Sequence, residues 1–508
     1  MASRRPFSAL RLRPLAGLMF AALLAPQAYA VNGQFTPYVS ASALATDNIN
    51  LAPSNSKQAG LVLTLSPGFR WASLGDPNAV YNISYSLSDV TRFTSGNTTN
   101  NLYHSLAANS HFALVHNVLF LDADANVSQV YNNLLATGSG ISNNNNNLVT
   151  LASYSVSPYA VQRLGGTAVA TLRVTQSGTY SPDAGYGQSS QSAVQAGVAS
   201  GPDFYRLSWG LNYSYTRATM QNAPSLSQYS SNAYLRTVSG TLGYLLTRHL
   251  QVNGTVGRDD NQYLSLTNTS GNFWSAGLAW RPSERTSISG SVGHRYFGRT
   301  YGFSLNQRTP LSSWTASYTQ SVSTLPMFLN ALVGIYVWEC GTTRVASTSS
   351  IIPPQPGCII QQQNPLAVGV VSLPYNQVFI SKAFIAGVTW TPRPRLGLSL
   401  TGSDVRRLYQ LSNFEDRSRY VMATATYQLT PHASLVATAG VTNNQIPAGV
   451  FTPVARNDMY YVGSVGLNRQ LSRNATGQLM YFYQELNSNV SSVDYIANSL
   501  LASITVTF

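Results

Sequence analysis

The chain has 508 residues, of which only 9% are charged and 44% are hydrophobic, and its formal net charge is +13. Soluble domains carry about a quarter charged residues, so this composition argues against a soluble protein. The cationic residues are dispersed along the sequence rather than clustered, which excludes nucleic acid as a partner and favours anionic lipopolysaccharide or an anionic solute.

No uncharged apolar run approaches the roughly 20 residues that a membrane-spanning helix needs, so spanning helices are excluded. A closed barrel of strands is the other structure in which every backbone group is hydrogen-bonded inside lipid. The 30 tyrosines and 7 tryptophans fit the aromatic girdles of such barrels. The sequence therefore predicts an all-β, transmembrane, antiparallel up-and-down barrel in the bacterial outer membrane.

Residues 1–30 have the features of a secretory signal peptide. Four arginines precede an apolar run at residues 15–25, and Ala28-Tyr29-Ala30 has the small-x-small form of a cleavage site. The apolar run is too short to span a bilayer as a helix. We expect cleavage after Ala30, which lowers the formal charge from +13 to about +9 because four arginines are lost, and leaves residues 31–508 as the barrel.

From residue 36 onward the sequence repeats a hairpin unit of two alternating strands, one short turn and one longer polar connection. Counting the units gives about 22 strands. A tight connection at residues 298–300 falls on the long-loop side, so the range is 20 to 24. Short turns are expected in the periplasm and longer loops outside the cell. The short turns are at residues 75–78, 116–117, 165–166, 200–203, 247–249, 281–284, 309–310, 391–394, 430–432 and 472–474, and examples of longer connections are 94–100, 132–147, 182–189, 218–230 and 446–456.

Alternation along single strands predicts which side chains meet lipid and which meet the lumen. Leu207, Trp209 and Leu211 share one parity and are expected to face outward, as is Leu172 in an earlier strand. Charge on the lipid face would cost roughly 2 to 4 kcal/mol per residue near mid-bilayer, so charged positions are expected inside. The candidate lumen-facing residues are Asp122, Asp124, Arg173, Arg206 and Arg295.

One connection, at about residues 324–375, is far longer than the others. It contains an apolar stretch, a proline cluster and the only two cysteines, Cys340 and Cys358. The periplasm and cell surface are oxidising, so we expect a disulfide between them that stabilises the loop by about 3 kcal/mol. Leu325, Phe328, Leu332 and Ile335 have the spacing of one helix face, although the uninterrupted apolar run makes the period ambiguous. An apolar segment is costly to leave in water, so we expect this loop to fold inward and narrow the pore.

The last strand alternates up to a terminal aromatic residue. Leu500, Ala502 and Ile504 share one parity with Phe508, while Ser503 and Thr505 take the other. A chain that stops on a bare aromatic residue resembles the closing strand of bacterial outer-membrane barrels. That resemblance implies that Phe508 is the insertion signal read by the barrel-assembly machinery.

The sequence offers no constellation that predicts an enzyme, a metal site or a cofactor. Histidines 116, 249 and 432 sit at short turns, whereas His104 and His111 lie on one predicted strand with opposite parity. Asp259-Asp260 and Glu415-Asp416 lie near loop ends and are expected to be solvated or calcium-bridging surface acids. We therefore expect neither catalytic residues nor a metal.

Two sets of motifs resemble the outer-membrane β-barrel proteins associated with PEP-CTERM and exosortase systems. The first is Thr-Asp-Asn-Ile-Asn-Leu-Ala-Pro at residues 46–53 with Ser-Pro-Gly at 66–68, and the second is Gly-His-Arg-Tyr-Phe-Gly at 293–298 with Asn-Gln-Arg-Thr at 306–309. The resemblance implies a barrel linked to exopolysaccharide production, with exopolysaccharide as a partner. It transfers no catalytic residue. Two functions remain open, a conduit for polysaccharide or small solutes and a non-transporting structural or surface-interaction barrel.

Overall fold

The computed structural model describes residues 33–131, 142, 148–182, 188–221, 231–324, 335–340, 343–348, 358–361, 377–448 and 454–508. Within these ranges the chain forms one 22-stranded sheet and one separate three-stranded sheet. The only helix in these ranges is a short 3-10 segment, η2 (Ser491–Val493). The described residues contain no helix with the length and hydropathy needed to cross a membrane.

Strands of the large sheet form the wall. They are β1 (Gly33–Thr46), β2 (Gly60–Ser73), β3 (Ala79–Thr94), β4 (Asn97–Val115), β5 (Leu119–Tyr131), β6 (Leu148–Leu164), β7 (Ala168–Tyr180), β8 (Gln188–Ser200), β9 (Leu207–Gln221), β10 (Ser231–Thr247), β11 (Leu250–Asp259), β12 (Gly271–Ser283), β13 (Thr286–Arg295), β14 (Gly298–Arg308), β15 (Ser312–Ser323), β19 (Phe379–Arg393), β20 (Leu396–Tyr409), β21 (Glu415–Thr430), β22 (Ala433–Ile446), β23 (Arg456–Gln470), β24 (Ala475–Ser488) and β25 (Tyr495–Thr507).

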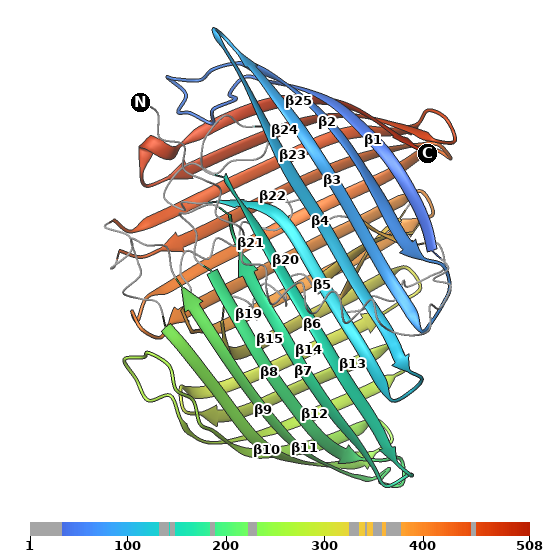
Figure 1. Ribbon diagram of the computed structural model, residues 1–508, viewed down its shortest axis with the longest axis vertical. Helices are drawn as coiled ribbons and strands as arrows, with labels where there is room; N and C mark the ends of the chain where they lie inside the picture. The colour runs from blue at the N-terminus through green and yellow to red at the C-terminus, as the bar shows by residue number, and fades with distance from the viewer. Residues whose placement is uncertain are drawn as a thin grey trace, which may run out of the picture.

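The wall closes on itself. Each wall strand pairs antiparallel with its neighbours in the chain, and β1 pairs with β25, so the first and last strands lie side by side (Figure 1). The described residues therefore form a closed barrel of 22 antiparallel strands, which confirms the predicted fold and strand count.

The side chains of the wall alternate as the sequence predicts. Leu211 of β9 is 63% exposed and Ile504 of β25 is 42% exposed, whereas Ala218 and Met220, of the opposite parity on β9, are buried. Trp209 shares the outward parity of Leu211. An apolar outer surface on a closed barrel is stable only in contact with hydrocarbon, because exposed apolar patches of this extent are unfavourable in water. The protein is therefore an outer-membrane barrel.

All ten predicted short turns connect wall strands, and they define the periplasmic end. The expectation of a longer connection at residues 94–100 is wrong. Thr94 pairs directly with Asn97, so β3 and β4 continue to a two-residue turn in which Gly96 has φ +84°. Glycine adopts positive φ without steric cost, which allows a polar stretch to remain in strand conformation up to so tight a turn.

The buried residues gather on the inner face of the extracellular half of the barrel. Val62, Val90 and Ile49 form one buried cluster near the ends of β2 and β3, and a second cluster includes Met220 and Val378. Towards the periplasmic end most inward side chains are only half-buried. The lumen is therefore filled from the extracellular side.

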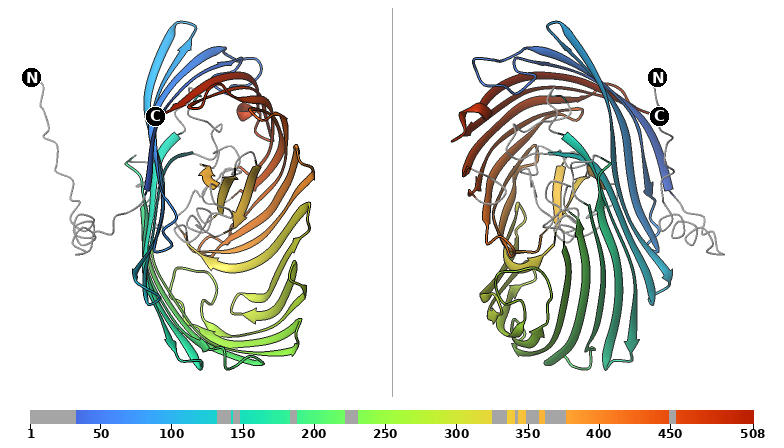
Figure 2. Two further views of the ribbon diagram at one scale, coloured as in Figure 1. Left: turned by 90° about the vertical axis from the view of Figure 1, so that its right-hand side faces the viewer. Right: turned by 60° about the vertical axis from the view of Figure 1, so that its left-hand side comes forward.

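Three short strands lie inside the ring of the wall in both views of Figure 2. They are β16 (Ile335–Cys340), β17 (Thr343–Thr348) and β18 (Cys358–Gln361), with β16 in the middle. Ile335, one of the residues expected to line a helix face, instead begins strand β16, and Leu325, Phe328 and Leu332 fall outside the described residues. Cys340 lies directly opposite Cys358 in the antiparallel register of β16 and β18. Direct cross-strand partners have Cα atoms about 4.5 to 5.5 Å apart, a separation that a disulfide can bridge, and the disulfide remains a prediction.

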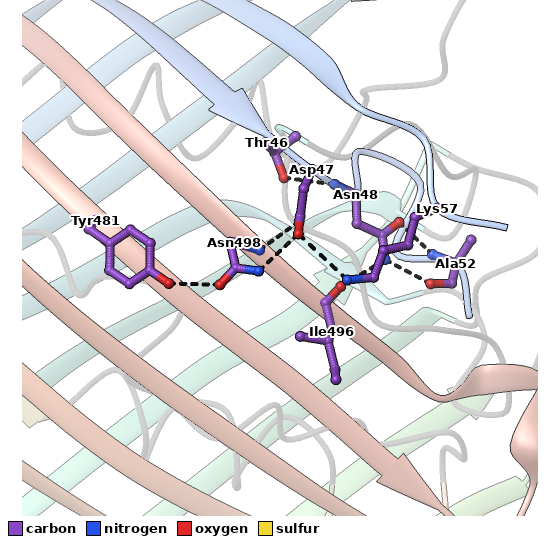
Figure 3. A network of polar contacts seen from close by, with 8 residues as sticks. All are labelled: Thr46, Asp47, Asn48, Ala52, Lys57, Tyr481, Ile496 and Asn498. Atoms are coloured by element: carbon purple, nitrogen blue, oxygen red, sulfur yellow. Dashed lines mark hydrogen bonds and ion pairs between the residues drawn. The ribbon is translucent and has the colours of Figure 1, made fainter. Parts of the chain in front are cut away.

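A network of polar contacts joins the first and last strands at the extracellular end (Figure 3). The backbone N–H of Asn498 donates to Asp47 Oδ1 at 2.7 Å and its side-chain amide donates to Asp47 Oδ2 at 2.8 Å. Tyr481 Oη donates to Asn498 Oδ1 at 2.7 Å, and Lys57 Nζ lies 3.5 Å from Asp47 Oδ2. We call Asp47, Asn48, Lys57, Tyr481 and Asn498 the seam network.

Asn48 completes the seam network from within the first loop. Its buried side-chain amide donates to the carbonyl oxygens of Ala52 at 2.7 Å and Ile496 at 3.0 Å, and its Oδ1 accepts from the N–H of Ala52. Asp47 and Asn48 therefore bind the last strand as well as forming the loop after β1. Within this loop Leu51 has a positive φ of 50°.

Substitution of Asn498 by Ala should lower the free energy of unfolding by about 1 to 3 kcal/mol, because its side-chain hydrogen bonds with the Asp47 carboxylate and the Tyr481 hydroxyl are lost while the backbone bond to Asp47 remains. Urea unfolding measures this change. Asn272→Ala, an exposed position elsewhere on the wall, is the matched control and should alter stability by less than about 0.5 kcal/mol.

The effect of Asn498→Ala should also depend on pH. Burial alone would raise the pKa of Asp47, but the hydrogen bonds from Asn498 and the ammonium of Lys57 outweigh it and lower the pKa below 3.8. A lowered carboxyl pKa stabilises the fold above the unfolded pKa, and this contribution is lost as pH falls through the folded value. The difference between wild type and variant should be full at neutral pH and shrink below pH 3.8. A difference that persists unchanged in acid would contradict this assignment.

The predicted disulfide can be tested by peptide mapping. Arg344 is the only Lys or Arg between Cys340 and Cys358, so trypsin separates the two cysteines into different peptides. Without reductant we expect one cross-linked species, which dithiothreitol splits into two. Two free-thiol peptides from protein isolated under non-reducing conditions would contradict the prediction.

Candidate functional site: the barrel lumen

A compact polar cluster lies on the inner wall towards the periplasmic end. Asp122 of β5 is opposite His111 of β4, and its Oδ1 is 2.7 Å from His111 Nδ1. Arg173 of β7 donates to Asp122 Oδ2 at 2.8 Å. Asp124 accepts a 2.8 Å hydrogen bond from Asn109. The structure thus brings Asp122, Asp124 and Arg173 together on the inner wall.

Aromatic rings frame this cluster. The rings of Phe120 and Tyr159 stack with centroids 4.9 Å apart, and the guanidinium carbon of Arg173 lies 3.9 Å from the centroid of Tyr159. The His111 ring stacks on Phe120 at 5.7 Å. We call His111, Phe120, Asp122, Tyr159 and Arg173 the inner-wall patch.

The inner-wall patch combines flat apolar rings with charged donors and acceptors. Aromatic faces pack against the C–H face of a sugar ring, while a carboxylate accepts from sugar hydroxyls and a guanidinium donates to sugar oxygens. The three polar members remain 22 to 34% exposed, so a solute in the lumen can reach them. Within the described ranges, no group of three or more His, Cys, Asp or Glu side chains is placed to hold a metal ion.

Sequence reasoning missed His111. Its opposite parity to His104 is correct, since His104 contacts Tyr85 Oη at 2.9 Å on the outer face while His111 faces the lumen. The partner of His111 comes from the next strand, and pairing between strands is not visible in the sequence of one strand. The available signal was that His111 and Asp122 flank the same short turn, at residues 116–118, on strands that a hairpin would pair.

The other two predicted lumen residues lie elsewhere. Arg206 immediately precedes β9 at the periplasmic end, is exposed, and stacks over the Tyr205 ring at 5.8 Å. Arg295 ends β13 at the extracellular end, where it donates to Asp259 Oδ1 at 3.0 Å and lies over the Phe273 ring at 4.4 Å. Neither residue joins the inner-wall patch.

The acids expected at the surface are instead buried on the inner wall. Asp259 is 2% exposed and pairs with Arg295, and Asp416 is 4% exposed with its Oδ1 2.7 Å from Arg407 Nε. The expectation of solvated acids is therefore wrong for both. They are buried because the lumen is filled at this height, and a buried carboxylate is tolerated only when it is paired.

Similar buried charges line the inner wall around the extracellular rim. Arg456 Nε donates to Asp458 at 2.7 Å on β23, and the guanidinium of Arg92 on β3 donates to Asn101 at 2.6 Å and Tyr103 at 3.0 Å. Together with the Asp259–Arg295 and Arg407–Asp416 pairs they form what we call the rim charges. They lie on the lumen side of the wall.

Two contacts reach across the lumen near the extracellular end. Thr324, directly after β15, donates through Oγ1 to Gln191 Oε1 of β8 at 2.8 Å, and both side chains are buried. Strands β9 to β14 separate β8 from β15 along the wall, so this bond does not join neighbours. Val378, directly before β19, packs in one buried cluster with Ala218, Met220 and Ala233 of β9 and β10.

A second bridge connects two extracellular loops. The backbone N–H of Leu266, between β11 and β12, donates to the carbonyl of Gln410, between β20 and β21, at 3.0 Å. Tyr263 of the same loop shares a 2.9 Å hydrogen bond with Tyr296, and burial raises the pKa of both phenols. Both tyrosines therefore remain neutral hydrogen-bonding groups at physiological pH.

No protein-family model matches the sequence, and no curated protein matches it significantly. Among solved structures, the chain is similar to the siderophore receptor PirA from Pseudomonas aeruginosa, with 10% identity, a TM-score of 0.46, and coverage of 93% of this chain and 80% of that chain. It is also similar to the FrpB iron transporter from Neisseria meningitidis, with 10% identity, a TM-score of 0.48, and coverage of 93% and 82%. At this identity the likeness concerns the barrel fold alone.

Substitution of Asp416 by Ala should destabilise the protein by about 3 to 5 kcal/mol, because it leaves Arg407 buried and unpaired. Asp404→Ala is the matched control. Asp404 also pairs with an arginine, Arg417, but on the outer face where both are partly exposed, so we expect a loss of only about 0 to 1 kcal/mol. Urea unfolding distinguishes the two. Replacing both buried partners, as in Arg407→Met with Asp416→Leu, should restore most of the stability, and equal losses in D416A and D404A would contradict a buried pair.

Proposed function

We propose that this protein is a conduit of the outer membrane for polysaccharide or small sugars, with a lumen gated by the segment between β15 and β19. The observation that carries the proposal is which residues make the contacts that cross the lumen. Thr324 and Val378, which bridge the lumen, are the residues that flank this segment. The wall itself is wide enough to conduct, since barrels of about 22 strands enclose a lumen that is open unless it is plugged.

The inner-wall patch supports sugars as the class of solute. Its stacked Phe120 and Tyr159 rings suit pyranose faces, and Asp122 with Arg173 supplies one acceptor and one donor group. A balanced pair of charges favours neutral or mixed-charge solutes over strongly anionic ones. A link to exopolysaccharide production is the extension of this proposal that the motif resemblance favours.

A non-transporting surface barrel is the second candidate. The rim charges favour it, because buried, paired charges are costly to expose. The two candidates differ in whether removal of the segment between β15 and β19 opens a pore that conducts and binds sugars.

Replacement of residues 325–376 by a short Gly-Ser linker tests the conduit. Ser323 pairs directly with Phe379, so β15 and β19 remain a continuous hairpin without the segment. We expect the single-channel conductance in planar bilayers to rise several-fold. An unchanged conductance in a folded variant would contradict gating by this segment.

Block by oligosaccharide then separates the two candidates. In the linker variant, oligosaccharide should reduce the current, and Tyr159→Ala with Asp122→Asn should weaken that block. The matched control is Ser153→Ala, an inward position on β6 outside the patch. A large current that no oligosaccharide affects would leave a pore without the proposed solute class and would favour the surface barrel.

A further inference from the structure

Three cations lie next to one another on the outer face of the barrel. In the sheet register Lys382 of β19 is directly opposite Arg406 of β20, which is directly opposite Arg417 of β21. They share the outward parity of Phe384, Leu400 and Val421, which are 42 to 50% exposed. We call Lys382, Arg406 and Arg417 the outer cation row.

The outer cation row is unfavourable unless an anion is present. Directly opposite side chains have Cβ atoms about 4.5 to 5.5 Å apart, and like charges in that position are destabilising. Asp404 accepts a 2.8 Å hydrogen bond from Arg417 Nε and lies 3.7 Å from Arg419 Nε. Glu415, also on the outer face, is exposed. In the part of the chain that the structure describes, no carboxylate forms an ion pair with Lys382 or Arg406.

A further donor beside the row also lacks an acceptor. Arg419 Nε is buried and has no hydrogen-bond partner, since its distance to Asp404 is too long for a hydrogen bond. Buried donors normally have an acceptor, so Arg419 Nε is free to donate to a bound anion. The four cations and two acids of this region leave an excess of positive charge.

The position of the outer cation row along its strands indicates which layer of the membrane it contacts. Lys382, Arg406 and Arg417 each lie within four residues of the extracellular end of their strand, roughly 10 Å along it at 3.3 Å per residue. The next outward row towards mid-bilayer is Phe384, Asp404 and Arg419, and apolar outward residues such as Leu400 and Val421 lie beyond it. The row therefore sits at the level of the lipid headgroups of the outer leaflet.

We propose that the outer cation row binds a phosphate group carried by an outer-leaflet lipid. A phosphate supplies several strong acceptor oxygens, which Arg binds in a forked geometry and Lys binds as a point charge. It would neutralise the repulsion within the row and accept from Arg419 Nε. This site lies on the opposite face of the wall from the lumen, so it does not depend on the proposed conduit.

Native mass spectrometry of the full chain in nanodiscs tests the site. We compare bisphosphorylated lipid A with dephosphorylated lipid A on the wild type, and expect retained lipid only with the phosphorylated form. Lys382→Gln with Arg406→Gln should weaken retention by about tenfold or more, since each cation near an anionic surface contributes on the order of fivefold. Arg258→Gln is the matched control, because Arg258 is an exposed outward cation opposite Val238 and Asn272.

The outcomes are distinguishable. If the wild type retains dephosphorylated lipid A as well as the bisphosphorylated form, this result alone overturns the proposal. Equal losses in the row variant and in Arg258→Gln would show a general charge effect and overturn the specific site. Displacement of lipid A by millimolar inorganic phosphate would identify free phosphate as the ligand, against the lipid assignment. Thermal unfolding of the row variant checks folding, and removal of like charges should leave it at least as stable as the wild type.

Discussion

The structure depends on the requirement that every backbone N–H and C=O inside hydrocarbon has a hydrogen-bond partner. A linear sheet of any length leaves two open edges, and only the pairing of β1 with β25 removes both. The seam is formed by segments more than 450 residues apart in the chain, so it cannot rely on local contacts. Asp47 and Asn48 add side-chain bonds where backbone pairing ends, which makes the extracellular end of the seam the best-secured part of the closure.

A second constraint acts on the inside. A cylinder of this size has an inner surface too large for its own side chains to fill. In this protein the interior is occupied by a segment of the same chain, and the inner wall changes character with height. Half-buried polar residues and the inner-wall patch line the periplasmic half, whereas paired charges and small apolar clusters lie nearer the extracellular end. The outer face follows a different rule, since it is apolar at mid-height and cationic at the level of the headgroups.

The barrel could be predicted because the patterns that indicate it can be read along the sequence of a single strand. Period-two alternation, turn residues and low charge are visible along one strand, and they indicated both the strand number and the facing of Trp209 and Ile504. The sites could not be predicted in this way. The contact of His111 with Asp122, the row of Lys382, Arg406 and Arg417, and the bridge from Thr324 to Gln191 all join residues on different strands, and their register is a property of the sheet. Burial of Asp259 and Asp416 was missed for a related reason, because loop ends are solvated only where nothing fills the lumen beside them.

The direct pairing of Ser323 with Phe379 means that the wall is continuous across the point where the inner segment leaves and re-enters it. The entropy cost of closing a loop grows only slowly with its length, so this position accepts an insertion of almost any size with little effect on the register of the strands around it. The barrel wall and the segment between β15 and β19 are thus separable parts of one polypeptide. Mutation can reshape what occupies the interior while the cylinder that crosses the membrane keeps its dimensions.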